Sequence, residues 1–344
     1  MTRNHKHAPV LSASGDLYER VSALLRDARN RAIQNVNTVM VQAYWRIGRE
    51  IVEEEQRGQN RADYGKSILE NLAVRLTGDF GSGFDPSNLW NMRKFYLTFP
   101  ILDALRRELS WTHYRILMRV DNPDARAFYE IECAKSRWSA RELERQKGSL
   151  LFERLALSKD KKGLKRLAQK GQEIQTTEDL IKDPYILEFA GLSPTAKLYE
   201  SSLEQALCGN LSRFLLELGK GFTFAGRQKR LTLDGDHFFI DLVFYNTILR
   251  CYVLIDLKIG KLTHQYLGQM QMYVNYFDRE VKQKDDNPTV GLLLCEDKKE
   301  AVVRYTLSNE NKQIFASKYK LYLPSEKELR KELLEERKRL DQYR

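Results

Sequence analysis

The chain has 344 residues, of which 42% are hydrophobic and 30% are charged, and its formal net charge at pH 7 is +10. This composition is ordinary for a globular protein of two domains, and it excludes a disordered or membrane-embedded chain. The basic balance favours an anionic partner, nucleic acid above all, although many basic proteins bind nothing acidic. No apolar run approaches the roughly 20 residues of a membrane helix, and the first residues lack the apolar core of a secretory signal. We therefore expect no membrane partner and a cytoplasmic location.

Residues 1–15 are expected to form a disordered tail, and residues 16–157 carry a helical pattern throughout. Leu17, Val21 and Leu24 begin one apolar stripe at spacings of three and four residues. Tyr44, Ile47 and similar positions continue the pattern in the next helix. The helices of this N-terminal domain are expected at residues 17–28, 38–56, 62–80, 86–99, 111–120, 123–136 and 139–157.

The loop over residues 81–85 joins two of these helices, and Asp85 before Pro86 is a suitable N-cap for the second. Two helices joined by a turn that contains glycine are compatible with a helix-turn-helix, in which Arg93 and Lys94 would reach DNA. A plain helical hairpin with a solvated face fits the same pattern equally well. The domain is therefore expected to bind DNA or a protein partner.

Residues 158–178 lose apolar content and gain lysine and arginine, which indicates a basic, partly helical linker between domains. The C-terminal domain over residues 179–344 begins with a helix at 201–218. Three antiparallel strands follow, with an Asp234-Gly235 turn between the first two. A helix at 263–278, a strand at 289–295, a helix near 298–307, a short strand at 320–323 and a charged helix from residue 325 complete the chain. The order α-β-β-β-α-β predicts an α/β sandwich with a mixed sheet.

The stretch from His237 to Lys258 is predicted to be a mostly apolar β-hairpin, and it nevertheless contains Asp241, Asp256 and Lys258. A buried unpaired carboxylate costs several kcal/mol, so each must be matched by a partner. Asp256 and Lys258 are two residues apart and point to the same face of their strand. If the turn centres on residues 248–249, Asp241 lies opposite Asp256 at about 5 Å between Cβ atoms, which lets both carboxylates share one cation.

These residues resemble the PD-(D/E)xK nuclease signature. The wider stretches GRQKRL, IDLVFYN, LRCYVLIDLKIGK and YLGQMQMYVNYFD, with YWRIGREIVEEEQRG and LSWTHYRILMRV in the helical domain, resemble the YhcG-type nucleases of that superfamily. The likeness covers most of the chain. Asp256 is a departure, since Glu is expected there, but Asp is an accepted alternative. The resemblance implies a restriction-endonuclease-like fold for the C-terminal domain.

The resemblance also implies a DNA endonuclease that depends on Mg²⁺ or Mn²⁺. Asp241, Asp256 and the backbone carbonyl of Leu257 would hold the metal, which polarises the phosphate and activates a water. Lys258 would orient that water or stabilise the transition state. The remaining implied site residues are Glu204 and Gln269 near the metal and phosphate, and Arg227, Gln228, Lys229 and Arg230 on the nucleic-acid backbone.

Several alternatives stay open. Asp256 and Lys258 also fit a simple same-face salt bridge, and Glu204 an exposed helix position. A nucleic-acid-binding accessory protein with an idle or partner-dependent nuclease fold is the second hypothesis, and a helical interaction scaffold the third. DNA is the expected partner, RNA is not excluded, and a homodimer or protein partner is compatible with the sequence. Recombination, repair and defence are equally open as pathways.

Other enzyme classes have little support. The sequence contains no GxxxxGK[ST], HExxH or GxSxG motif. Cys133, Cys208, Cys251 and Cys295 form no CxxC pair, which argues against a zinc ribbon or a redox site.

Overall fold

The structure is a computed structural model that describes residues 17–57, 62–156, 161–192, 199–298, 300–307 and 311–342. The predicted tail over residues 1–15 lies outside the described residues. The chain divides into two compact units. The first holds the described residues up to Asp121 together with Cys133–Ala140, and the second holds Asn122–Glu132 and the chain from Arg141 onward.

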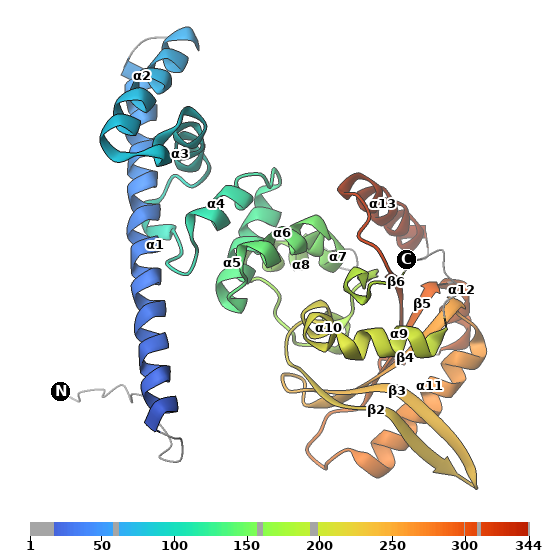
Figure 1. Cartoon of the computed structure of the whole chain (residues 1–344). Coiled ribbons are helices and arrows are strands. Elements are labelled where there is room, and N and C mark those ends of the chain that lie inside the picture. The colour runs from blue at the N-terminus through green and yellow to red at the C-terminus, as the bar shows by residue number, and fades with distance from the viewer. Residues whose placement is uncertain are drawn as a thin grey trace, which may run out of the picture. The chain divides into compact units, whose positions relative to one another are not determined.

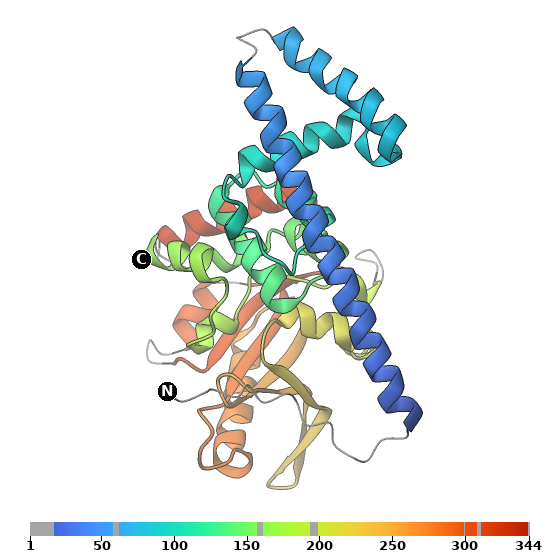
Figure 2. The same cartoon turned by 90° about the vertical axis from the view of Figure 1, so that its left-hand side faces the viewer.

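The first unit is helical, and its longest element is an unbroken helix of 41 residues, α1 (Leu17–Arg57) (Figures 1 and 2). The prediction of two separate helices here was wrong, because no glycine or proline interrupts residues 17–47. The other helices of the first unit are α2 (Ala62–Phe80), α3 (Pro86–Thr98) and α4 (Trp111–Leu117).

Helix α3 packs against the second half of α1. Asp85 caps α3 as predicted, since its carboxylate accepts hydrogen bonds from the backbone N–H groups of Ser87 and Asn88. Gly48 lets the two helices approach closely, because a Cβ there would collide with the carbonyl of Met92. Ile51 and Met92 are buried in the cluster that results, so this contact is the core of the first unit.

Helix α5 (Pro123–Ser136) leads to α6 (Ala140–Gly148) and α7 (Leu151–Ala156). The single helix predicted over residues 139–157 is two helices, because the chain turns at Leu150, whose φ is +49°. Helix α8 (Lys161–Lys170) lies in the segment predicted as the basic linker. Helices α6 to α8 belong to the second unit together with the sheet.

A mixed six-stranded sheet with the order β1-β6-β5-β4-β3-β2 forms the centre of the second unit. Strands β2, β3 and β4 pair antiparallel, and β4, β5, β6 and β1 pair parallel. The predicted fold class is confirmed, but the last strand was wrongly placed at residues 320–323. The strands are β1 (Tyr185–Ile186), β2 (Phe222–Leu233), β3 (Asp236–Asn246), β4 (Cys251–Lys261), β5 (Val290–Asp297) and β6 (Ile314–Lys320).

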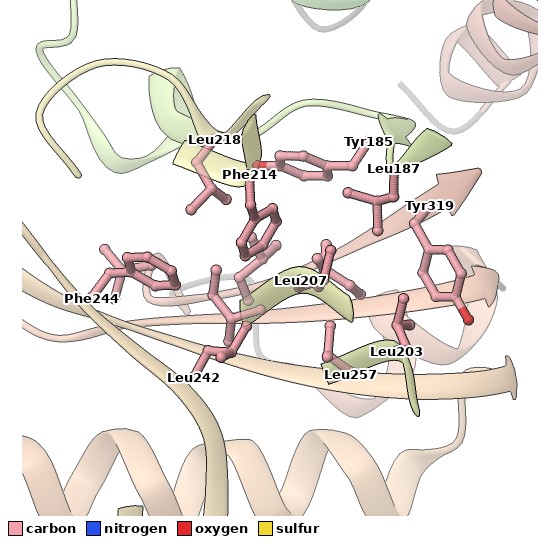
Figure 3. Packing of buried hydrophobic residues seen from close by; sticks show 14 of the residues in the cluster. Tyr185, Leu187, Leu203, Leu207, Phe214, Leu218, Leu242, Phe244, Leu257 and Tyr319 are labelled. Atoms are coloured by element: carbon pink, nitrogen blue, oxygen red, sulfur yellow. The ribbon is translucent and has the colours of Figure 1, made fainter. Parts of the chain in front are cut away.

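Helices cover both faces of this sheet. Helices α9 (Glu200–Gly209) and α10 (Leu211–Leu218) pack on one face, where Leu207, Phe214 and Leu257 share a buried cluster (Figure 3). These two helices were predicted as one, but Asn210 leaves helical geometry with φ −118° and ψ 33°. Helix α11 (His264–Tyr276) covers the other face through Met270 and its neighbours. Helices α12 (Glu300–Thr306) and α13 (Glu326–Gln342) complete the unit.

No helix within the described ranges is both long enough and apolar enough to cross a bilayer.

Candidate active site

The two predicted carboxylates meet where β3 and β4 separate. The hairpin register is the predicted one, with Asn246 opposite Cys251 and Leu242 opposite Ile255. This register places Asp241 across from Asp256, one residue beyond the last backbone pair. Asp241 takes over the next ladder position, because its Oδ2 accepts a hydrogen bond from the N–H of Leu257 at 2.8 Å. The side chain of Asp241 therefore closes the end of the paired region and lies beside Asp256.

Gln228 connects Asp241 to helix α9. Its Nε2 donates to Asp241 Oδ1 at 3.0 Å and to Glu204 Oε2 at 2.7 Å. Gln228 lies in β2 with φ +46°, a left-handed conformation that costs energy for a residue with a side chain. Glu204 is buried, with 8% of its surface exposed. The predicted nucleic-acid contact Gln228 and the predicted catalytic Glu204 are thus brought together in one hydrogen-bonded group.

Lys258 lies on the other side of Asp256. Its Nζ is 2.9 Å from Asp256 Oδ2 and 3.3 Å from Glu200 Oε2, and it lies over the ring of Tyr266. Glu200 also accepts a hydrogen bond from the N–H of Ile259. Glu200 and Tyr266 were missed in the sequence. Glu200 is four residues before Glu204, so the two share a helix face, and this spacing is the signal that would have found Glu200.

Burial and the neighbouring charges shift the proton affinities of this group. Burial, followed by the negative charge of Asp241, raises the pKa of Asp256 to about 7. Burial also raises the pKa of Glu204, against the opposing hydrogen bond from Gln228. Burial favours neutral Lys258, but the carboxylates of Asp256 and Glu200 outweigh it and hold the pKa of Lys258 above its ordinary value. Lys258 is therefore a cation at neutral pH.

The raised pKa of Asp256 predicts a stability cost above neutral pH in protein without metal. An acid whose pKa rises on folding stabilises the folded state below its unfolded pKa of about 4 and loses this contribution as pH increases through its folded pKa. Asp256→Asn is therefore expected to be more stable than wild type at pH 8, by about 1–2 kcal/mol, and to lose this advantage near pH 5. Thermal unfolding in chelator at both pH values measures the difference, with the exposed Asp285→Asn as control. Equal stability of wild type and Asp256→Asn at pH 8 would contradict the assigned proton affinity.

The remaining predicted residues lie at different places. Gln269 is half-buried on α11, three residues after Tyr266 and therefore on the same helix face. Arg227, Lys229 and Arg230 are exposed on β2. Leu257 is fully buried with its side chain in the α9 cluster, and its carbonyl remains a predicted metal ligand.

The two predicted DNA contacts of the first unit are engaged within α3 and α1. The guanidinium Nε of Arg93 donates to both carboxylate oxygens of Glu55, at 2.9 and 2.7 Å. The Nζ of Lys94 lies 5.5 Å from the ring centre of Trp90. A role of Arg93 in DNA binding would require it to leave Glu55, and contact by either side chain stays a prediction.

The oxygens at this site fit a divalent ion. Asp256 Oδ2 is buried, and the ammonium Nζ of Lys258 lies 2.9 Å from it. Two acidic side chains held this close, with one ammonium group beside them, leave negative charge that a divalent ion can neutralise. Across the described ranges no three His, Cys, Asp or Glu side chains gather as a closed metal cage. The donors are instead a carboxylate pair on the hairpin, which suits Mg²⁺ because this ion keeps several waters.

The fold and this carboxylate pair define a protein of the PD-(D/E)xK nuclease class. Residues 178–334 match the family described as the YhcG PDDEXK nuclease domain, and residues 20–154 match the DUF1016 N-terminal domain. The chain is 36% identical to "Putative nuclease YhcG" of Escherichia coli (strain K12) over 92% of this chain and 93% of that protein. The chain therefore belongs to the YhcG family, as the sequence resemblance predicted. Members of the PD-(D/E)xK class typically use a divalent metal.

Two solved structures are similar to part of the chain. A repair endonuclease from Pyrococcus abyssi superposes with a TM-score of 0.26 at 18% identity, covering 38% of this chain and 50% of the other. The apo form of EndoMS gives a TM-score of 0.25 at 13% identity, with 38% and 49% covered.

Proposed function

We propose that this protein is a nuclease that hydrolyses phosphodiester bonds of DNA with Mg²⁺ or Mn²⁺, and that it acts in recombination, repair or defence. One observation carries the proposal. Two carboxylates, Asp241 and Asp256, are held against each other at the open end of a hairpin, beside a lysine that stays protonated. Burial first, and then the negative charge of Asp241, raises the pKa of Asp256, so holding both acids ionised here has a cost that a bound cation would offset.

The ion, when bound, polarises the phosphate and lowers the pKa of a water. Asp241 and Asp256 would hold the ion, and the hydrogen bonds from Gln228 and from the N–H of Leu257 fix the orientation of Asp241. Lys258 is better suited to stabilise negative charge on the phosphate than to remove a proton from water, because its pKa is held high. Its contacts with Asp256 and Glu200 fix the position of its ammonium group.

Incubation of the purified full chain with duplex, branched and single-stranded DNA, and with RNA, tests the proposal. Cleavage is expected with Mg²⁺ or Mn²⁺ and none with excess chelator. DNA binding without cleavage under either ion, at pH 7 to 9, would favour an accessory protein with an idle nuclease fold. Absence of both binding and cleavage would leave the interaction scaffold as the better description.

The β2–β3 ribbon is the element that we expect to hold the nucleic-acid backbone. Strands β2 and β3 pair from Phe222 opposite Asn246 to Leu233 opposite Asp236, whereas β3 pairs with β4 only from Leu242 onward. The tip of the β2–β3 ribbon therefore extends past the rest of the sheet (Figure 1). Leu231 on the ribbon is buried under α11, while Arg230 and Phe239, which pair across the strands, are exposed. The exposed side leads directly to Gln228 and Asp241.

Loss of two ribbon charges is expected to weaken binding uniformly across sequences. Lys229→Ala/Arg230→Ala should lower the slope of log K against log salt concentration by up to about 2, since each phosphate contact contributes about 0.9. Titration of labelled DNA at several salt concentrations, in Ca²⁺ or chelator, measures this slope. The control Lys327→Ala/Lys331→Ala removes the same charge from exposed positions of α13 and is expected to leave the slope unchanged. An equal effect of both pairs would show that net charge, and not the ribbon, governs binding.

A further inference from the structure

The first half of α1 exposes an unusual amount of apolar surface. Between Leu17 and Met40 nine large apolar side chains are exposed, among them Leu25 with 56% and Val36 with 62% of the residue surface accessible. This segment of 24 residues is about 36 Å long at 1.5 Å per residue. Contiguous apolar patches of several hundred Å² on a protein surface mark interaction sites. The stability of a helix in water also comes mainly from packing of its apolar face.

Five of these nine residues belong to a regular repeat. Apolar residues recur at spacings of four, four and three, which is a period of 11 residues or about 3.67 residues per turn, so the stripe winds only slowly around the helix. The stripe consists of Leu17, Val21, Leu25, Ala28, Ala32, Val36, Val39, Ala43 and Ile47. Its last member, Ile47, packs in the core of the first unit, whereas the part from residue 17 to 39 is exposed. The pattern that makes a core at one end of α1 therefore continues without a partner at the other end.

The stripe is complementary to itself when reversed. An antiparallel copy centred on Ala28 would place Leu17 beside Val39, Val21 beside Val36 and Leu25 beside Ala32. Large residues then meet small ones at the centre, where Ala28 faces Ala28 and the helices can approach closely. The stripe is apolar, and the charged side chains of the segment lie beside it or on the other side of the helix, so the stripe itself fits an apolar partner surface; these side chains are Glu19, Arg20, Arg26, Asp27, Arg29 and Arg31. Antiparallel pairing of two copies also has twofold symmetry, so the assembly ends at a dimer, and the two helix dipoles point in opposite directions.

We propose that residues 17–40 of α1 form a homodimer interface, in which this segment pairs antiparallel with the same segment of a second copy. The interface lies in the first unit and does not depend on the proposed nuclease function. Because the partner is the same chain, a dimer would carry two nuclease domains.

Sedimentation of the full chain across concentrations, without nucleic acid, tests the proposal. Wild type is expected to be a dimer in the micromolar range. Val21→Glu/Val36→Glu places charge in the stripe and is expected to raise the dissociation constant at least about 100-fold. Ala23→Glu/Asn30→Glu adds the same charge to the opposite side of α1 and should dimerise as wild type does. A wild-type chain that stays monomeric at all concentrations, as expected if the stripe binds elsewhere in its own chain, would overturn the proposal.

Cross-linking reports the orientation without destabilising the helix. The described part of α1 contains no native cysteine. Ala28→Cys is expected to form a disulfide dimer under mild oxidation. Leu17→Cys alone should not, because antiparallel copies hold those positions about 33 Å apart, but a mixture of Leu17→Cys and Val39→Cys should. Disulfide dimers of Leu17→Cys alone would overturn the antiparallel pairing.

Discussion

Asp256→Ala is expected to reduce phosphodiester cleavage by about 10²- to 10⁴-fold, with DNA binding in chelator unchanged. Asp256 supplies the buried carboxylate of the pair, so its removal would take away one of the two proposed metal ligands. Asp241→Ala is expected to have a similar effect and also leaves the N–H of Leu257 unpaired. Lys258→Ala should lower the rate constant for cleavage while the metal concentration for half-maximal activity changes little. Single-turnover cleavage at saturating protein, over a range of Mg²⁺ concentrations, separates these effects.

The control for these variants is Asp285→Asn, which removes one negative charge from an exposed loop position and should cleave at the wild-type rate. Circular dichroism and thermal unfolding establish that each variant is folded. Cleavage that persists at the wild-type rate in folded Asp256→Ala and Lys258→Ala would exclude this site as the catalytic centre. Loss of cleavage with loss of DNA binding would instead assign the carboxylates a structural role.

The carboxylate pair was predictable because it depends on local chemistry. The turn at residues 248–249 fixes the register of β3 and β4, and the register fixes which side chains face each other. Side chains alternate between the two faces of a strand, so Lys258, two residues after Asp256 in β4, points to the same face as Asp256. None of this requires knowledge of the rest of the chain, so Asp241, Asp256 and Lys258 were placed correctly in relation to one another.

The parts that sequence reasoning missed depend on long-range packing. Gln228 was predicted only as a contact to the nucleic-acid backbone. Its link between Asp241 and Glu204 occurs in a left-handed backbone conformation, which no residue-type preference indicates for glutamine. Glu200 reaches Lys258 only because α9 begins near the carboxyl end of β4, which is a property of how helix and sheet pack. The break at Asn210 and the full length of α1 were missed because the apolar periodicity was the only guide to helix ends. This periodicity continues through Asn210, where a helix ends, and through the middle of α1, where none does, so it locates neither.

A buried ionic network joins the helices before the sheet to the sheet itself. The carboxylate of Glu217 on α10 is fully buried and accepts a hydrogen bond from Arg154 on α7 at 2.7 Å and one from the N–H of Ile186 in β1 at 3.0 Å. Arg145 lies 3.4 Å from its other oxygen, and Lys182 donates to the backbone carbonyl of Glu217. Burial alone would raise the pKa of Glu217, but the surrounding cations, Arg154 first, hold it below the ordinary value. The single carboxylate of Glu217 therefore balances the positive charge of several side chains that are removed from solvent.

Glu217→Gln is expected to destabilise the second unit by about 3–5 kcal/mol, because it retains the shape of the side chain and removes the negative charge that pairs with buried Arg154. The cost comes chiefly from the cations left without a counterion, so Glu217→Gln/Arg154→Met should recover part of the loss. Urea unfolding followed by fluorescence measures both variants, and Glu335→Gln, an exposed carboxylate of α13, is the control. If Glu217→Gln instead unfolded like wild type, burial of the network would not be a source of stability. Since Glu217 holds both β1, through the N–H of Ile186, and α7, through Arg154, a loss confined to the sheet without α7 would be equally inconsistent with this network.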